Sequence, residues 1–320
     1  MRAFRLAYDG RPFYGFQRQP TVPTVEGALF DALVDLSVLS PDADKPTGYA
    51  AAGRTDAGVS AAAQTVAFEC PEWLTPRALN SELPATIRAW ASADVPEDFH
   101  ATHDATRREY VYHLYAPCVT DDNDGDCKDG DTDSIDDGDN DGDGTNGDTT
   151  DDNDTRPLDS RRRVDDDRVA AALDALAGRH DFHNLTPDET GTKRDLTTEF
   201  ERDGDILELT FAAGGFARQL VRRLVAVVDA VGRGQQPLAW IETLLGPEPV
   251  DPRPPVASPE PLVLSRVEYP GVDFARDPEA ATSGADAFGE RVVDALVGYR
   301  VSAALVGRLA AAERDPEDKL

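Results

Sequence analysis

The stretch AAGRTDAGVSA, residues 51–61, sets an arginine, a threonine and an aspartate between two glycines, with alanines on both sides. Gly53 and Gly58 permit backbone angles and close approaches that a side chain would forbid, so a large flat molecule can come near this loop. Arg54 and Asp56 are two residues apart, and in an extended segment they project to the same side. Such a pair suits a site where a carboxylate takes part in the reaction while a guanidinium binds a phosphate. An ordinary polar turn explains the same residues, because Asp and Gly are common in loops.

Strand and helix patterns alternate irregularly around this loop. Alternating apolar residues predict strands at 2–8, 65–69, 108–115, 205–212 and 262–269. Helical spacing predicts a helix that Thr24 caps, and further helices at 165–178, 216–234, 238–245 and about 288–312. Several strands have one polar face, which is typical of an antiparallel or mixed sheet. The sequence therefore predicts an α+β fold, with a sheet core flanked by helices.

An aspartate-rich tract interrupts these patterns. Between Asp121 and Asp154 there are 16 aspartates, no glutamate and one lysine. Such a segment buries too little apolar surface to order itself, so we expect 119–163 to be a disordered insertion. A calcium-binding tract is the alternative, since DNDGDG at 139–144 matches the start of an EF-hand loop. The twelfth position of that loop is Thr150 and not the required glutamate, which counts against calcium.

The tract also divides the chain. We expect an N-terminal half at 1–118 that carries the GRTDAG loop, and a C-terminal half at 164–270. A linker and a last helix follow at 271–320.

Acidic residues dominate the composition, with 61 Asp and Glu against 32 Lys and Arg and a net charge of −29. Taken alone, this argues against nucleic-acid binding, which normally needs a basic surface. Only four of the basic residues are lysine, however, and the acidic excess is spread over nearly the whole chain. We expect this pattern in a protein that has to stay soluble in concentrated salt, where a Debye length of about 3 Å screens the repulsion between its carboxylates and an RNA. The net charge then reflects the salt concentration around the protein more than the kind of ligand that it binds.

Other composition signals exclude several classes of protein. Cys70, Cys118 and Cys127 are odd in number and lack histidines at ligand spacing, so we expect reduced thiols and neither a disulfide framework nor a zinc site. The motif HDFH at 180–183 lacks further metal ligands, and we expect it to shape the wall of a site. No run of 18 apolar residues and no signal peptide occurs, so we expect a cytoplasmic protein without membrane association.

Five blocks of the sequence resemble motifs of the TruA-type tRNA pseudouridine synthases and occur in the same order. They are YDGRPFYGFQRQP (8–20), AAGRTDAGVSAAAQ (51–64), DFHATHDATRREYVYHLY (98–115), GRHDFHNLT (178–186) and GGFARQLVRRLVAVVDAVGRG (214–234). The chain resembles this family over about 1–118 and 164–270. The resemblance implies a sheet core built from two similar α+β halves, with the active-site cleft between them and a homodimer around it. The implied substrate is a uridine among positions 38 to 40 in the anticodon arm of tRNA.

The resemblance also implies roles for particular residues. Asp56 becomes the catalytic aspartate, and Arg54 helps to bring the target nucleotide out of the RNA stack. Tyr110 becomes the aromatic residue that packs against the uracil ring, and Arg222 the partner of the catalytic carboxylate. Isomerising uridine needs no redox change and no energy input, so we expect neither a cofactor nor a metal.

Each role has an ordinary structural alternative. Tyr110 is explained equally by a half-buried strand tyrosine, and Arg222 by a solvated stripe with Arg218 on one helix. Gln17 and Gln19 either touch RNA or satisfy a turn. Two other functions remain open on the sequence alone, an inactive RNA-binding protein on the same scaffold and an acidic calcium-binding or interaction protein acting through 121–154.

Overall fold

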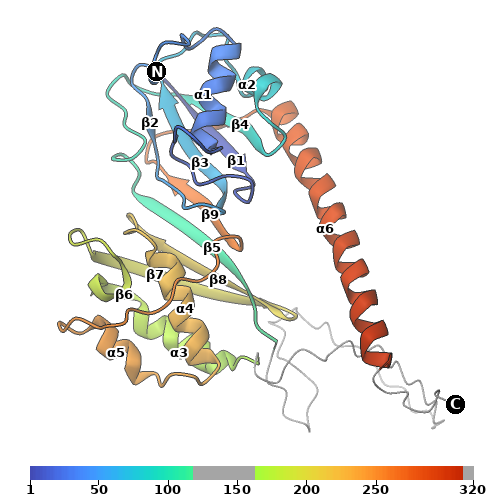
Figure 1. The fold of residues 1–320 in the computed structure, drawn as a ribbon. Coiled ribbons are helices and arrows are strands. Elements are labelled where there is room, and N and C mark those ends of the chain that lie inside the picture. The colour runs from blue at the N-terminus through green and yellow to red at the C-terminus, as the bar shows by residue number, and fades with distance from the viewer. Residues whose placement is uncertain (118–162, 313–320) are drawn as a thin grey trace, which may run out of the picture.

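The structure, a computed structural model, describes residues 1–117 and 163–312 (Figure 1). The aspartate-rich tract at 121–154, with its EF-hand-like start, lies outside the described residues. So do Cys118 and Cys127, while Cys70 is a free thiol.

A mixed sheet of ten strands runs through the described part of the chain. Its order is β10 (Ala275–Arg276), β4 (Ile87–Asp94), β1 (Arg2–Tyr8), β3 (Ser60–Phe68), β9 (Leu262–Glu268), β5 (Arg107–Tyr115), β8 (Ile206–Ala213), β7 (Lys193–Asp203) and β6 (Gly178–Asp181), and β2 (Ala50–Ala51) pairs with β3. Every pairing is antiparallel except that of β3 with β9, which is parallel. The predicted α+β class with a mixed sheet is confirmed.

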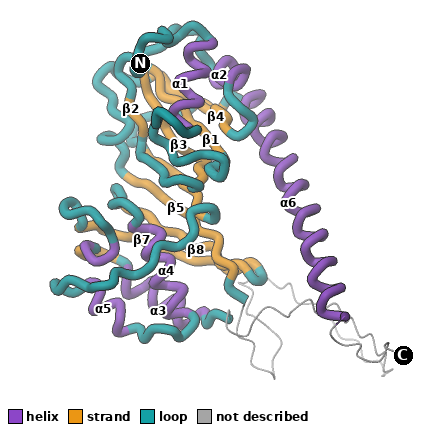
Figure 2. Tube along the Cα trace, in the orientation of Figure 1, coloured by secondary structure: helices purple, strands orange, loops and turns teal. Residues whose placement is uncertain are grey.

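The sheet has two groups of strands, with β5 and β9 between them (Figures 1 and 2). The helices are α1 (Val25–Asp35), α2 (Pro76–Glu82), α3 (Asp166–Leu176), α4 (Leu220–Gly232), α5 (Ala239–Leu245) and α6 (Pro278–Ala312). The first two lie beside the N-terminal strands, whereas α3, α4 and α5 lie beside the C-terminal strands (Figure 1). One continuous hydrophobic core joins both groups.

The first helix forms as its sequence predicts. The Thr24 hydroxyl accepts a hydrogen bond from the backbone N–H of Gly27 at 3.1 Å, which satisfies one of the free donors of the first turn. Its buried residues recur at helical spacing and are Val25, Leu29, Phe30, Ala32 and Leu33. Its first backbone N–H groups, of Val25 and Glu26, donate to the carbonyls of Gly15 and Phe16, which joins the helix to the loop at 13–20.

Several boundaries differ from the sequence-based expectations. The strand expected at 65–69 begins at Ser60, and the last helix begins at Pro278, ten residues before its expected start. The helix expected from 216 begins only at Leu220, because Gln219 takes a left-handed conformation with φ of 61°. Arg218 therefore precedes the helix, and the expected stripe of Arg218 and Arg222 on one helix is wrong.

Candidate active site

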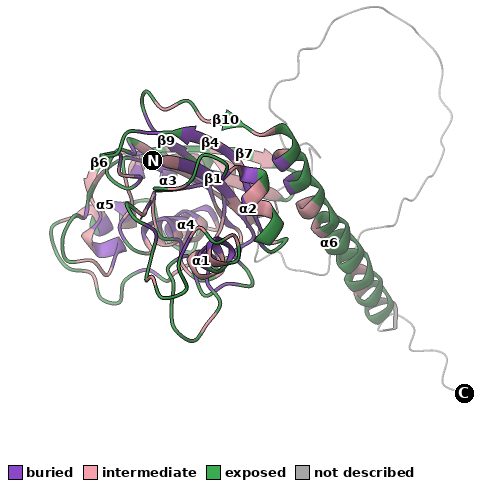
Figure 3. Cartoon of the chain, turned by 90° about the horizontal axis from the view of Figure 1, so that it is seen from above, coloured by how far each residue is buried: buried purple, intermediate pink, exposed green. Residues whose placement is uncertain are grey.

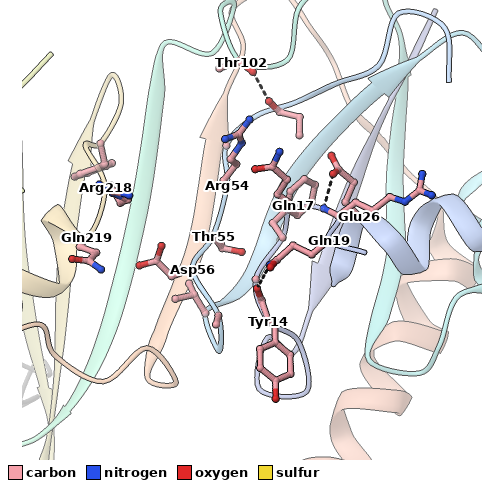
Figure 4. Close-up of a pocket in the computed structure, with 18 of the residues that line it drawn as sticks. Tyr14, Gln17, Gln19, Glu26, Arg54, Thr55, Asp56, Thr102, Arg218 and Gln219 are labelled. Atoms are coloured by element: carbon pink, nitrogen blue, oxygen red, sulfur yellow. Dashed lines mark hydrogen bonds between the residues drawn. The ribbon is translucent and has the colours of Figure 1, made fainter. Parts of the chain in front are cut away.

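A cavity of about 1430 Å³ opens between the two groups of strands (Figure 4). Residues of the GRTDAG loop line one side of it, including Arg54, Thr55 and Asp56. The other side comes from the segment that leads into α4 and from the first turn of that helix. Segments more than 160 residues apart in the chain thus face one another across this space.

The contact that crosses the cavity joins Asp56 to Arg222. Nη1 of Arg222 donates to Oδ2 of Asp56 at 3.1 Å, and Nε donates to the backbone carbonyl of Ala257 at 2.7 Å. The Arg222 side chain is 15% exposed, whereas that of Asp56 is 36% exposed. The carboxylate is therefore fixed by a largely buried cation and remains accessible from the cavity.

Buried hydrogen bonds hold the loop beneath Asp56. The hydroxyl of Thr55 lies 2.8 Å from the hydroxyl of Tyr8, and both residues are buried. Nε2 of the fully buried Gln64 donates to the carbonyl of Gly53 at 2.8 Å. Since Thr55 turns into the core, its neighbours Arg54 and Asp56 both line the cavity, as their spacing predicts.

Tyr110 forms an apolar part of the wall. Its ring meets the edge of Phe216 with a centroid distance of 5.3 Å and an interplanar angle of 90°. Burial raises the pKa of Tyr110 to about 12, with Arg108 opposing the shift and Asp56 adding to it. The hydroxyl is therefore neutral at physiological pH. Both aromatic rings line the same cavity as Asp56.

The relatives of this chain belong to one enzyme family. A model of that family, described as tRNA pseudouridine synthase, matches residues 172–270. A tRNA pseudouridine synthase A of Haloarcula marismortui is 51% identical over 305 residues, which cover 94% of this chain and 98% of the relative. That of Natronomonas pharaonis is 50% identical over 95% of this chain and 98% of its own length. The chain belongs to the tRNA pseudouridine synthase family.

This membership confirms the resemblance and the expectation that the chain is an enzyme. A more distant relative, a tRNA pseudouridine synthase A of Methanocella arvoryzae, is 34% identical over 86% of this chain and 86% of its own length. The relatives at about half identity come from halophilic archaea, which confirms the interpretation of the acidic composition. Among the described residues no helix is long and apolar enough to cross a bilayer.

Arg108 does not line the cavity but supports segments that do, and the sequence reasoning missed it. Its guanidinium is buried and donates to the backbone carbonyls of Ala52, Thr102 and Gly214 at 2.5–3.1 Å. Burial lowers the pKa of Arg108, and no carboxylate contributes to its hydrogen bonds within the described residues. It thereby joins the strand that enters the GRTDAG loop to the segment that leads to Phe216. Its position two residues before Tyr110 places it on the same face of β5, but that spacing does not indicate its carbonyl acceptors.

The remaining predicted residues lie along the same cavity. Arg54 is exposed and lies further from the Asp56 carboxylate, toward Thr102 (Figure 4). Gln17 and Gln19 are also exposed in the lining. Nε2 of Gln19 donates to the carbonyl of Tyr14 at 3.0 Å, so this side chain satisfies a turn, which was one of its two expected roles. The side chain also lines the cavity.

The lining is less acidic than the rest of the protein. Five basic residues line the cavity, namely Arg18, Lys45, Arg54, Arg218 and Arg222. Four carboxylates face them, from Glu26, Asp44, Asp56 and Asp188. In a chain with a net charge of −29, the lining of this cavity is thus nearly balanced in charge.

The HDFH segment at 180–183 does not line this cavity, so the expectation that it shapes the site wall is wrong. Phe182 is fully buried in the core, and Nε2 of His180 lies 2.8 Å from the carbonyl of Ala177. His183 lies beside Asp181, with 3.4 Å between Nδ1 and Oδ1. Within residues 1–117 and 163–312 no group of three His, Cys, Asp or Glu side chains is placed to hold a metal.

The pKa of Tyr110 predicts a pH-dependent stability. The folded-state pKa of about 12 lies above the value of about 10 in an unfolded chain, so the stabilisation is complete below pH 10 and is lost between pH 10 and 12. The parent should lose about 2 kcal/mol more stability than Tyr110→Phe across that interval. Thermal unfolding of both proteins between pH 9 and 12 measures the difference. Parallel curves would show that the Tyr110 hydroxyl ionises freely in the folded protein.

Proposed function

We propose that this tRNA pseudouridine synthase acts on uridine in the anticodon stem-loop, at position 38, 39 or 40, with Asp56 as the catalytic carboxylate. The observation that carries the assignment of Asp56 is its 3.1 Å pair with Arg222 across a cavity of about 1430 Å³, whereas the positions in tRNA follow from the resemblance. That volume is ample for a single nucleotide with its neighbouring phosphates. The resemblance of the GRTDAG block supports the same carboxylate.

The reaction is an isomerisation in which every atom is retained. The C1′–N1 bond of uridine breaks, the uracil turns, and C5 bonds to C1′ while the C5 proton leaves and N1 gains a proton. An ionised Asp56 serves as a nucleophile, toward the sugar or toward the ring. Arg222 keeps that carboxylate charged and oriented, because a nearby opposite charge favours the ionised form. The step consumes no cofactor and no metal.

The rest of the lining has roles that follow from its chemistry. Tyr110 and Phe216 offer aromatic surface on which a detached uracil stays while it turns. Extracting the base from the RNA stack costs a few kcal/mol, which Arg54 offsets by filling the vacated space and binding a phosphate. Gln17 and Gln19 provide amide groups at the mouth for RNA contact. We further propose that the enzyme works in the cytoplasm as a homodimer.

The test is a pseudouridine assay on unmodified tRNA transcripts in molar KCl, with sites mapped by carbodiimide treatment and primer extension. We expect conversion confined to positions 38 to 40. Conversion elsewhere in the tRNA would overturn the proposed positions and leave the enzyme class intact. A folded protein that binds tRNA and converts nothing would instead support the RNA-binding alternative.

A further inference from the structure

Tyr14 is an exposed aromatic residue on the lining of the cavity. Outside α6 (Figure 3), four large hydrophobic residues of the described structure are exposed: Tyr14, Trp73, Tyr115 and Leu238. Tyr14 is 59% exposed, and of these four it alone lines the cavity. Single exposed apolar side chains are ordinary on a protein surface. One that borders the site of a bound substrate is in a position to contact it.

The side chain of Tyr14 has no partner among the described residues. Its ring pairs with no other ring there, and its hydroxyl makes no hydrogen bond. In Figure 4 the ring points away from Gln17 and Thr55. The backbone of Tyr14, by contrast, is fully bonded, since its N–H donates to the carbonyl of Pro23 at 2.9 Å and its carbonyl accepts from Nε2 of Gln19 at 3.0 Å. The fold thus fixes the backbone of this residue and leaves its ring available for a ligand.

Two backbone hydrogen bonds join the loop of Tyr14 to the GRTDAG loop. The N–H of Phe16 donates to the carbonyl of Thr55 at 3.0 Å, and the N–H of Gly58 donates to that of Phe13 at 3.2 Å. The bonded residues lie on both sides of Tyr14 in one loop and on both sides of the proposed catalytic carboxylate in the other. The backbone of Tyr14 therefore has a fixed position relative to that carboxylate.

A glycine lets the two loops approach this closely. Gly15 has a φ of 101°, which a residue with a side chain rarely adopts. A Cβ on Gly15 would lie 3.0 Å from the carbonyl oxygen of Thr55 and 3.3 Å from the backbone nitrogen of Ala57. The turn at Gly15 thus holds the backbone against the GRTDAG loop, while the ring of the preceding residue faces outward (Figure 4).

We propose that the ring of Tyr14 stacks on an unpaired base of the anticodon loop, from a nucleotide near the target uridine. The inference rests on the proposed function, which places the target in that arm of tRNA. The base is not the target itself, because the Tyr14 ring points away from Asp56 (Figure 4), and Tyr110 and Phe216 supply the aromatic surface for the detached uracil. A ring on a loop that is bonded to the GRTDAG loop can hold a neighbouring nucleotide while the target enters the cavity.

Stacking suits the charge of this cavity. Five basic residues and four carboxylates line it, so phosphate contacts draw on little excess positive charge. In concentrated salt such contacts also gain little from counterion release. Stacking on an aromatic ring needs no net charge and accepts any base, because every base has a π-face. A residue whose backbone the loop already holds in place also loses little conformational freedom on binding.

Binding of an end-labelled, unmodified tRNA transcript in molar KCl, followed by fluorescence anisotropy, tests the stacking. We expect Tyr14→Ala to raise the dissociation constant about fivefold to a hundredfold, the usual cost of losing one stacked base. Tyr14→Phe keeps the ring face and should stay within about twofold of the parent. Trp73→Ala is the matched control, because Trp73 is 54% exposed and lies outside the lining. It should bind like the parent.

A fluorescent base identifies the stacked nucleotide. The same tRNA is assembled by ligation, with 2-aminopurine at each unpaired position of the anticodon loop in turn. We expect one position, other than the target, where binding changes the fluorescence equally with the parent and Tyr14→Phe, and differently with Tyr14→Ala. The slope of log Kd against the logarithm of the KCl concentration should be the same for the parent and Tyr14→Ala, because the ring neutralises no phosphate.

Three results would overturn the proposal. Equal dissociation constants for Tyr14→Ala and Trp73→Ala would mean that the ring contacts no base. An equal loss in Tyr14→Phe and Tyr14→Ala would assign the contact to the hydroxyl, and a changed salt slope would assign it to a phosphate. Circular dichroism confirms that the variants are folded. Pseudouridine formation is a separate readout, since a parent that binds tRNA and converts nothing would overturn the proposed function and leave the binding comparison intact.

Discussion

Asp56→Asn is expected to lower the rate of pseudouridine formation by at least about 10⁴-fold. The amide has nearly the size of the carboxylate and can still accept a hydrogen bond from Arg222, but it is neither a nucleophile nor a base. The buried hydrogen bonds of Thr55 and Gln64 that hold the loop do not involve the altered group, so the fold should survive. Single-turnover conversion of an unmodified tRNA transcript in molar KCl measures the loss, and binding of the same transcript should change little.

A second carboxylate of the same cavity supplies the control. Asp188 lines it as well, and its Oδ1 lies 3.5 Å from Nε of Arg218. Asp188→Asn removes an equal charge from the same space, and we expect it to keep the rate within about threefold. Comparable losses in both variants would mean that the charge of the cavity matters and that Asp56 has no particular chemical role.

Arg222→Met is expected to lower the same rate by about 10² to 10³-fold, the usual cost of removing one charged group that stabilises a reacting centre. Methionine keeps much of the apolar volume of the side chain, which is only 15% exposed. The change leaves Asp56 without its cationic partner and the carbonyl of Ala257 without its donor. Breaking such a pair costs far more than losing an exposed one.

Arg218→Met is the matched control for this change. Arg218 lines the cavity four residues earlier, but its side chain is 63% exposed and its partner is Asp188. We expect a modest rise in the concentration of tRNA needed for half-maximal rate, with the maximal rate nearly unchanged. Arg222→Lys should fall between the parent and Arg222→Met, because it keeps the charge and loses the forked geometry. Equal effects of Arg218→Met and Arg222→Met on the maximal rate would contradict the assignment of Arg222.

Elements with one apolar face could be predicted from the sequence, and those without one could not. The strand at 2–8 and the helix from Thr24 were predicted closely, since their buried residues follow periods of 2 and 3.6. In β4 the buried positions after Ile87 are alanines, which give little contrast with their polar neighbours. In β7 only Leu196 is buried, so that strand has no apolar period at all. Its place in the sheet comes from pairing with β8.

The site divides in the same way. The residues that stand in distinctive motifs, Asp56, Arg54, Tyr110 and Arg222, could be named from the sequence, and the structure places all four around one cavity. Arg108 could not be identified from the sequence, because its acceptors are backbone carbonyls from three distant segments. No spacing along the chain indicates which carbonyls these are. The role of a residue that binds backbone becomes visible only when the fold has brought those segments together.

The place of β9 in the sheet has a consequence for biosynthesis. Residues 262–268 lie between β3 and β5, so in the described structure no strand of the N-terminal group pairs directly with a strand of the C-terminal group. Until β9 has been translated, the edges of β3 and β5 that it will pair with have no partner strand. Exposed strand edges can pair with strands of other chains. Asp56 and Arg222 both precede β9 in the chain, so we expect them to come together only after this late strand has paired with β3 and β5.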